Sequence, residues 1–177
     1  MPASLGRRES VSLSAPCLLT AAADFGGFAC GTPSLDEWLK RRAMANQVSG
    51  AYRTYIVTDI SEGSHRVVGY YCLASGALAV IDAPGAIRRN MPDPVPIAVL
   101  GRLAVDSAWH GKRLGVALLQ DAVLRTTQAA DILGVRGLLA HAISAQAKTF
   151  YEYHGFKASP TQPMTLVLSI NSLVGHE

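Results

Sequence analysis

The chain has 177 residues, of which 49% are hydrophobic and 16% charged, and its formal net charge at pH 7 is +3. This length and composition are typical of one compact domain with a sizeable core and exclude general disorder, so we expect a single domain over residues 1–177. The mild positive charge suggests an anionic ligand but does not by itself indicate nucleic acid.

Residue spacing excludes two further classes of protein. The three cysteines, Cys17, Cys30 and Cys72, form no CxxC or Cys/His pattern, so neither a metal site nor a disulfide framework is expected. Arg7-Arg8 precede a weakly apolar stretch, but serines and a proline interrupt it, so no cleaved leader is expected. No run approaches the ~18–20 apolar residues of a membrane helix. The sequence therefore predicts a cytoplasmic protein with no membrane partner.

The first half of the chain predicts an N-terminal strand or arm over residues 1–24, less ordered than the rest, and then a helix over 34–49. Ser34 and Glu37 fit a capping box at the start of this helix, and Gly50 fits its end. Segments rich in Tyr, Ile and Val then indicate a β-hairpin, with strands at 52–59 and 67–75 and a turn at 61–64.

The second half begins with a proline-rich segment, 82–96, which is predicted to form a long surface loop. Beyond it, hydrophobic periodicity and turn residues predict strands at 97–105, 135–140, 156–158 and 165–170, and helices at 113–128 and 144–154, the latter ending at Gly155. This alternation favours an α/β fold, of the mixed α+β kind, in which helices cover a mixed sheet.

The turn before the helix at 113–128 has the features of an anion-binding site. Gly111 and Gly115 allow the backbone to approach a ligand closely, and a helix start offers unpaired N–H groups with a partial positive charge. Lys112 and Arg113 oppose the helix dipole by about 0.3–1 kcal/mol each, and a bound anion would remove that conflict. A solvated surface helix with unoptimised ends explains the same spacing.

The run from Val105 to Leu119 resembles the acetyl-CoA signature Q/R-x-x-G-x-G/A of the GNAT family of N-acetyltransferases. The resemblance implies the GNAT fold, a central and mainly antiparallel mixed sheet flanked by helices, and acetyl-CoA as cofactor. His110 and Arg113 depart from the signature, which has Gln or Arg and then Gly at these positions. The cofactor-binding residues that it implies, with the Val105 amide as oxyanion partner, are Leu103, Ala104, Val105, His110, Gly111, Lys112, Arg113, Leu114, Gly115 and Val116.

A second motif, A-x-x-F-Y-E-x-x-G-F, begins at Ala147 and also resembles the GNAT family, in the chain order that the family requires. It implies that Tyr151 is the general acid and that Phe150 contacts the cofactor. Successive helix positions point about 100° apart, so Phe150 is expected to face the core and Tyr151 the cofactor. Without the upstream motif, Tyr151 would be interpreted as a packing residue. Tyr153 and His154 are rivals on other faces of the helix.

The chemistry of the reaction narrows the acceptor. A thiol, with a reference pKa of about 8.5, leaves a thioester more readily when it is protonated, which gives Tyr151 its role. No general base stands out, because Glu37, Asp106 and Glu152 lack supporting geometry. An α-amine, with a reference pKa of about 7.7–8.0, needs a base less than a lysine amine at about 10.4. The site therefore favours an α-amine, such as that of an aminoacyl ester.

Residues 25–170 further resemble the toxin branch of the GNAT family, notably in segments 28–31, 35–39 and 100–106. This resemblance implies an enzyme that acetylates the α-amine of aminoacyl-tRNA and so stops translation. It also implies a ribbon-helix-helix antitoxin as the neutralising partner, and a homodimer.

Binding of tRNA requires cationic contacts to phosphates. The candidate tRNA-binding residues are Lys40 and Arg41 on the first helix, Arg88 and Arg89 on the proline-rich loop, and Arg102 beside the proposed active site. For Lys40 and Arg41, a solvated helix face is the alternative. Two other functions stay open: an N-acetyltransferase for a small amine or a protein N-terminus, and a non-catalytic CoA-binding or partner-binding module.

Overall fold

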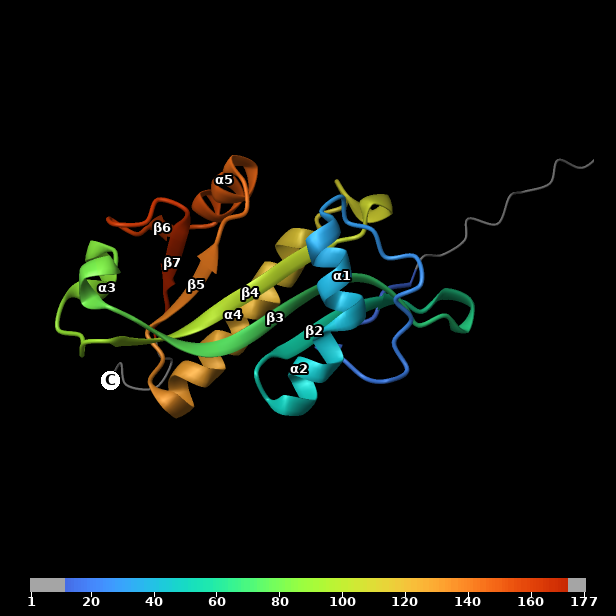
Figure 1. Cartoon of the computed structure of the whole chain (residues 1–177), viewed down its shortest axis with the longest axis horizontal. Helices are drawn as coiled ribbons and strands as arrows, with labels where there is room; N and C mark the ends of the chain where they lie inside the picture. Colours follow the sequence, from blue (N-terminus) through green and yellow to red (C-terminus); the bar gives the residue numbers. More distant parts are fainter. Residues whose placement is uncertain (1–11, 172–177) are drawn as a thin grey trace, which may run out of the picture.

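The computed structural model describes residues 12–171. These residues form one seven-stranded sheet in the order β1-β2-β3-β4-β5-β7-β6, and of its neighbouring strands β4 and β5 alone run in parallel (Figure 1). The predicted mixed and mainly antiparallel sheet is therefore confirmed. The strands are β1 (Cys17–Leu18), β2 (Arg53–Asp59), β3 (Arg66–Leu78), β4 (Val95–Val105), β5 (Gly137–His141), β6 (Lys157–Ala158) and β7 (Thr165–Ser169).

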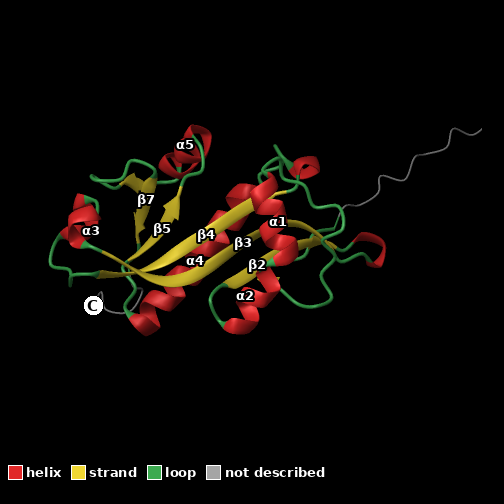
Figure 2. Ribbon diagram, in the orientation of Figure 1, coloured by secondary structure: helices red, strands yellow, loops and turns green. Residues whose placement is uncertain are grey.

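Helices lie against both faces of the sheet, as Figure 2 shows. Alternation along β3 separates the two faces: Tyr70 packs with Trp38 of the first helix, whereas its neighbour Tyr71 belongs to the cluster that contains Leu118. No helix of the described residues is long and apolar enough to cross a membrane. The α-helices are α1 (Pro33–Arg41), α2 (Ala43–Ser49), α3 (Gly85–Arg88), α4 (Leu114–Leu133) and α5 (Ala145–Tyr153).

The single helix predicted at 34–49 is wrong, because α1 and α2 are separate. Arg42 joins them with φ −120° and ψ −30°, and its carbonyl accepts a hydrogen bond from the Asn46 side chain at 2.8 Å. The predicted capping box is also wrong. Thr32 is the N-cap residue and Pro33 follows it, so α1 begins one residue before the predicted Ser34, at the position where the fixed φ of proline is favoured. The expected C-cap at Gly50 is confirmed, with φ 83°.

The proline-rich segment at 82–96 is not wholly a loop. It contains α3, and Ile87 of this short helix is buried in an apolar cluster with Ile97 and Leu139. The flanking strands are longer than predicted, since β3 continues to Leu78 and β4 begins at Val95. This end of the molecule is therefore a packed extension of the sheet, and α3 lies at the opposite end from α1 (Figure 1).

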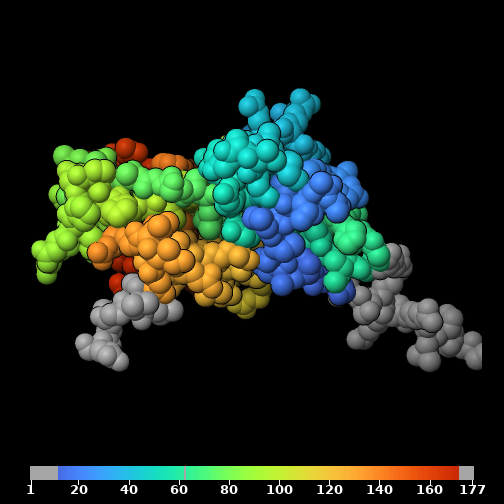
Figure 3. Space-filling model, turned by 90° about the horizontal axis from the view of Figure 1, so that it is seen from below, coloured from blue at the N-terminus to red at the C-terminus, as the bar shows by residue number. Residues whose placement is uncertain are grey.

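The N-terminal segment is anchored where it is described. Leu13 bridges to Asp59, β1 pairs with β2, and the Arg125 guanidinium of α4 donates to the Pro16 carbonyl at 3.2 Å. Figure 3 shows this segment in blue beside the orange α4. The strand expected within residues 1–24 is thus present at 17–18, while the first part of that arm, with Arg7-Arg8, lies outside the described residues.

Candidate active site

The candidate active site begins where β4 and β5 separate. The parallel pairing joins Ala98 to Leu138 and ends at Leu100 opposite Ala140, although β4 continues to Val105. Beyond Leu100, the edge of β4 that faces β5 therefore has no partner strand. An extended ligand can add to this edge as a strand would, through backbone hydrogen bonds.

A β-bulge marks the start of this separation. In the β3–β4 ladder, Cys72 lies opposite Arg102 and Leu73 opposite Leu100, so Gly101 is the extra residue. A side chain cannot replace its hydrogen, because a Cβ built at Gly101 would lie 2.6 Å from Cε1 of Tyr52. The bulge bends β4 at the point where its pairing with β5 ends, which opens the cleft.

The ladder shows which backbone groups face the cleft. The Asp106 N–H donates to the Val68 carbonyl at 2.8 Å, and Val105 lies opposite Gly69. Hydrogen-bonded and non-hydrogen-bonded pairs alternate in an antiparallel ladder, so the N–H and C=O groups of Val105 and Leu103 point away from β3. These groups face the cleft. Ala104 was also predicted to bind the cofactor, but by the same alternation its backbone N–H and C=O groups are hydrogen-bonded to β3.

Two adjoining cavities occupy the cleft, and Leu35, Leu103, Ile143, Gln146 and Phe150 line both of them. The larger cavity, of about 500 Å³, extends to the turn before α4 and the smaller one, of about 310 Å³, to α5 and the bulge. The predicted residues that line the larger cavity are Leu103, Ala104, Val105, His110, Gly111, Arg113, Leu114, Gly115, Val116 and Phe150.

The turn at the larger cavity presents unpaired amides. As the first residues of α4, Leu114, Gly115 and Val116 have no intrahelical acceptor for their N–H groups, and no side chain caps this end. The first turn also lacks an acidic residue. The His110 imidazole Nε2 lies 2.7 Å from the Val105 carbonyl oxygen and ties the turn to the end of β4. This arrangement fits the pyrophosphate of a nucleotide cofactor.

Lys112 is the one predicted cofactor residue that does not line either cavity. Its Nζ lies 4.8 Å from the centroid of the Trp109 ring, on the exposed side of the turn. The ammonium is therefore held by a cation–π contact and adds positive potential near the cavity without lining it.

The backbone conformation of Arg113 explains why the family signature has glycine at this position. It is the N-cap residue of α4 and adopts the left-handed conformation, with φ 63° and ψ 17°. A non-glycine residue pays about 1–2 kcal/mol for this conformation. The departure from the signature thus leaves the turn intact at the expense of local strain, and it adds a guanidinium to the cavity lining.

Tyr151 lies on α5, which begins at Ser144, where the hydroxyl oxygen accepts the Ala147 N–H at 3.1 Å. The Tyr151 side chain is 8% exposed and lines the smaller cavity. Burial raises its pKa to about 12. With this pKa the hydroxyl stays protonated at neutral pH, and no hydrogen bond to another described residue holds it.

The predicted orientation of the two aromatic residues is wrong in one respect. Phe150 does not face the core alone, because it is half-buried and lines both cavities, whereas Tyr151 is the more buried of the pair. Both residues therefore border the cleft. The rivals are farther from it: Tyr153 is 85% exposed, and neither Tyr153 nor His154 lines the two cavities.

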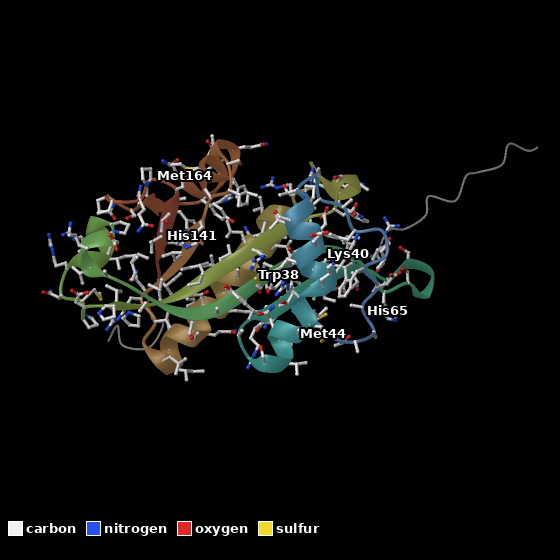
Figure 4. The ribbon with its side chains drawn as sticks, viewed as in Figure 1. Trp38, Lys40, Met44, His65, His141 and Met164 are labelled. Carbon is white, nitrogen blue, oxygen red and sulfur yellow. The ribbon has the colours of Figure 1, made fainter. Side chains whose placement is uncertain are left out.

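Arg102 points away from the α4 face and lines the smaller cavity. Its guanidinium carbon lies 4.4 Å from the centroid of the Trp38 ring and 5.9 Å from that of Tyr52 (Figure 4 labels Trp38). No carboxylate pairs with it in the described part of the chain. The cavity thus holds a stacked cation that an anionic substrate can reach.

The other four candidate tRNA-binding residues do not lie at the cleft. Lys40 and Arg41 are exposed on α1, and Arg41 lies 3.9 Å from Glu37 in an exposed ion pair. Arg88 and Arg89 are exposed on and after α3, at the other end of the molecule (Figure 1). The two pairs therefore lie on opposite sides of the cleft (Figure 1).

The candidate bases considered from the sequence do not line the cavities. Asp106 is buried and accepts the N–H groups of Ala29 and Ala108 at 3.1 and 3.0 Å. Glu152 is exposed, and Glu37 pairs with Arg41. Asp106 is thus a structural residue that fixes the turn after β4.

Sequence reasoning missed His141, the last residue of β5, which lines the smaller cavity (Figure 4). The available signal was its place at the carboxyl end of a strand that pairs in parallel, where open sheets bind ligands. Among the described residues, no group of three or more His, Cys, Asp or Glu residues could hold a metal ion.

Comparison with known proteins agrees with this geometry. Residues 50–158 match the Acetyltransferase (GNAT) domain family. The tRNA-acetylating toxin of Mycobacterium tuberculosis is 49% identical over 155 residues, which are 88% of this chain and 91% of that protein. AtaT complexed with acetyl-methionyl-tRNAfMet has a TM-score of 0.83 at 26% identity, with 89% of this chain and 95% of that chain covered.

A second solved structure shows a tyrosine-to-phenylalanine mutant of AtaT bound to acetyl-CoA and to the C-terminus of the antitoxin AtaR. Its TM-score is 0.74 at 26% identity, with 89% of this chain and 92% of that chain covered. The fold, the cleft and these similarities define an acyl-CoA N-acyltransferase. The chain belongs to the GNAT acetyltransferase family, in the branch of the tRNA-acetylating toxins.

Proposed function

We propose that this protein is a toxin that transfers the acetyl group of acetyl-CoA to the α-amine of aminoacyl-tRNA in the cytoplasm and thereby blocks translation. The observation that carries the proposal is one cleft with two chemically different ends. At one end, unpaired amides of α4 suit a pyrophosphate, and at the other, Arg102 and Tyr151 line a smaller cavity. The relative from Mycobacterium tuberculosis, a tRNA-acetylating toxin, supports this substrate.

Acetyl-CoA fits the larger cavity by the chemistry of its lining. The amides of Leu114, Gly115 and Val116 would hold the phosphates, and the backbone groups of Leu103 and Val105 would pair with the pantetheine arm. In this arrangement the N–H of Val105, which points away from β3, would be available to the thioester carbonyl, while the Val105 carbonyl oxygen is held by His110.

Tyr151 holds the proton that the departing thiolate requires. A phenol of pKa about 12 is a poor acid toward an ordinary thiol, whose reference pKa is about 8.5. Burial disfavours a thiolate as well as a phenolate, and it raises the pKa of Cys72, behind the bulge, to about 11. We therefore expect a thiolate that departs into the buried part of the cleft to take the Tyr151 proton more readily than a thiolate in water would.

The acceptor side favours an α-amine attached to a polyanion. Arg102 lines the acceptor cavity without a carboxylate partner in the described residues, and no Asp or Glu lines that cavity. A polyamine would meet a cation there instead of the acids that it needs. We place Arg102 against a phosphate near the acceptor end, with Lys40, Arg41, Arg88 and Arg89 as contacts farther along the tRNA.

We further propose that the protein forms a homodimer and that a ribbon-helix-helix antitoxin neutralises it. The AtaT complex with the antitoxin AtaR supports an antitoxin partner. Large apolar side chains that are exposed on α4, Leu124, Ile132 and Leu133, offer surface for a second chain. Light scattering of the purified protein, alone and with an antitoxin, measures both associations.

A panel of charged tRNAs tests the proposed function. Purified protein, acetyl-CoA and each aminoacyl-tRNA are incubated together, and N-acetylated aminoacyl adenosine is measured by mass spectrometry after nuclease digestion. We expect acetylation of at least one charged tRNA and none of the uncharged tRNAs. Acetylation of small amines or peptide N-termini, with no reaction on any charged tRNA, would contradict the proposal and support the alternative acetyltransferase.

A further inference from the structure

The smaller cavity contains an imidazole to which the proposed reaction has given no role. His141 ends β5 and lines this cavity together with Arg102 of β4 and Tyr151 of α5. These three residues come from β4 and β5, the strands that separate, and from α5, the helix beside the gap between them. Arg102 and Tyr151 are the titratable groups that share its cavity.

A short hydrogen-bond chain determines which ring nitrogen of His141 carries the proton. Nδ1 lies 3.0 Å from the Thr165 hydroxyl oxygen, and the Thr165 hydroxyl donates to the Gln162 side-chain oxygen at 3.2 Å. A hydroxyl has one proton to donate, so the Thr165 oxygen can only accept from His141. Nδ1 is therefore protonated in the neutral ring, and Nε2 keeps its lone pair.

The middle residue of this hydrogen-bond chain is shielded from water. His141 is exposed, but Thr165, which lies opposite it in the β5–β7 ladder, is only 5% exposed, so water has little access to the Thr165 hydroxyl. Gln162 is held in turn, since its backbone carbonyl accepts the Thr165 N–H at 3.0 Å. A fixed tautomer with a free Nε2 is the arrangement that a general base requires.

We propose that Nε2 of His141 is the general base of the proposed acetyl transfer, and that Thr165 and Gln162 are the residues that fix its tautomer. The attacking amine forms the N–C bond and gives one proton to Nε2, while the C–S bond breaks and the sulfur takes the proton of the Tyr151 hydroxyl. His141 then loses its proton to solvent and Tyr151 regains one, so the enzyme returns to its starting state. The inference rests on the proposed function.

The test is a single-turnover measurement of acetyl transfer to a charged tRNA. We expect His141→Ala to slow the transfer by about 10²-fold or more, with acetyl-CoA affinity unchanged, and added imidazole to restore part of the rate. The rate of the His141→Ala variant should follow the ionisation of the acceptor α-amine, with a midpoint at about pH 7.7–8.0. A structural role for His141 would give neither the rescue nor this profile.

Substitutions of the two residues that fix the tautomer of His141 provide a matched pair of variants. Thr165→Val removes the acceptor of the Nδ1 proton and should slow transfer by about tenfold or more, because the wrong tautomer becomes accessible. Gln162→Glu leaves an acceptor that cannot donate, so the direction of the hydrogen bonds is kept and Nδ1 of His141 should stay protonated. A His141 ring that loses its Nδ1 proton in Gln162→Glu would overturn the proposed hydrogen-bond chain.

A readout without substrate separates this inference from the proposed function. The ¹⁵N chemical shifts of the His141 ring in the intact protein should report a proton on Nδ1 in the wild type and in Gln162→Glu, but a mixture in Thr165→Val. A wild-type ring protonated on Nε2 contradicts the inference whether or not a charged tRNA is acetylated. An active wild type with an equally active His141→Ala contradicts the inference and leaves the proposed function standing.

Discussion

At the scale of single residues, burial sets the protonation of Tyr151. Its pKa in the folded protein is raised to about 12 by burial, whereas an unfolded tyrosine titrates at about 10. The stabilisation from the neutral form is therefore complete below pH 10 and is lost as the pH rises through about 12. Burial also raises the pKa of Tyr70 and Tyr71, so the whole protein should lose stability in alkaline solution.

Comparison with Tyr151→Phe isolates the contribution of one residue. Tyr70 and Tyr71 are present in both proteins, so the difference between the two stability curves belongs to Tyr151. We expect the free energy of unfolding in urea to fall more steeply between pH 10 and 12 in the wild type than in the variant, by up to about 1.4 kcal/mol per pH unit. Parallel curves over this range would show that Tyr151 is not buried as described.

Arg113 gives a second prediction at this scale, because its two effects oppose each other. Arg113→Gly removes the strain of a left-handed non-glycine residue and should stabilise the fold by about 1 kcal/mol. The same change removes a guanidinium from the cavity lining, and charge-assisted contacts to phosphate are worth about 1.5–3 kcal/mol. Calorimetry should therefore show a higher melting temperature and about tenfold weaker acetyl-CoA binding.

Asn90 is the control for Arg113→Gly. It is the other described non-glycine residue with positive φ, at 58°, and it does not line either cavity. Asn90→Gly should change stability in the same direction, by less because asparagine tolerates this conformation, and should leave acetyl-CoA affinity unchanged. Equal acetyl-CoA affinity in the wild type and Arg113→Gly would show that the guanidinium does not contact the cofactor.

At the scale of elements, the bulge in β4 is the feature that opens the cleft. Gly101→Ala would force a Cβ to within 2.6 Å of the Tyr52 ring, so either the ring or the bulge must shift. We expect a loss of about 1–3 kcal/mol in stability together with weaker acetyl-CoA binding, measured by denaturation and calorimetry.

The matched control for the bulge is Gly76→Ala, in the same pair of strands. Its Cβ would lie 2.8 Å from Val99, but Gly76 pairs with Ile97, on the far side of the cleft from the turn before α4. This variant should lose stability and keep its affinity for acetyl-CoA. If both variants bind acetyl-CoA as the wild type does, the bulge does not control the cleft.

The elements also show where sequence patterns are sufficient. Strand and helix alternation after residue 95 was predictable because each element has its own periodicity and its own end signals, such as Gly155 with φ 93° after α5. The break between α1 and α2 at Arg42 was not predictable, because the apolar spacing of Trp38, Leu39 and Ala43 continues across it unchanged. The separation of β4 from β5 is a tertiary feature, and one glycine in a strand pattern is a weak signal of it.

The candidate site likewise has parts that the sequence predicts and parts that it does not. Both motifs were predictable because each lies within one short segment, and they meet at the cleft from the turn before α4 and from α5. The hydrogen-bond partner of His141 was not predictable, because Thr165 is 24 residues away and the pair forms only when β5 and β7 align. The separate placement of Arg88 and Lys40 likewise depends on the tertiary fold, which puts α3 and α1 at opposite ends of the molecule.

At the scale of the whole molecule, the exposed cations make a prediction about RNA. Arg88→Ala combined with Arg89→Ala should weaken tRNA binding without a change in acetyl-CoA affinity, because α3 lies away from the cleft. If each arginine contacts one phosphate, the slope of log affinity against log salt should fall by about 1.4–1.8. Filter binding between low and moderate salt measures this slope.

Arg53 and Arg66 supply the charge-matched control for the RNA measurement. Both are exposed and neither lies near α3 or the cavities. Replacing both with alanine removes the same charge from a surface that is not proposed to bind tRNA, so the salt slope should stay unchanged. An equal loss of slope in the two double variants would mean that net charge, and not the α3 surface, attracts the RNA.

The most direct measurement compares the wild type with Tyr151→Phe in acetyl transfer from acetyl-CoA to charged tRNA under single-turnover conditions. Tyr151 lines the acceptor cavity, and the substitution removes one oxygen from a buried side chain. We predict N-acetylated aminoacyl-tRNA from the wild type, and a rate at least about 10²-fold lower in the variant at equal acetyl-CoA affinity. Transfer by both proteins at the same rate, or by neither on any charged tRNA, would contradict this account.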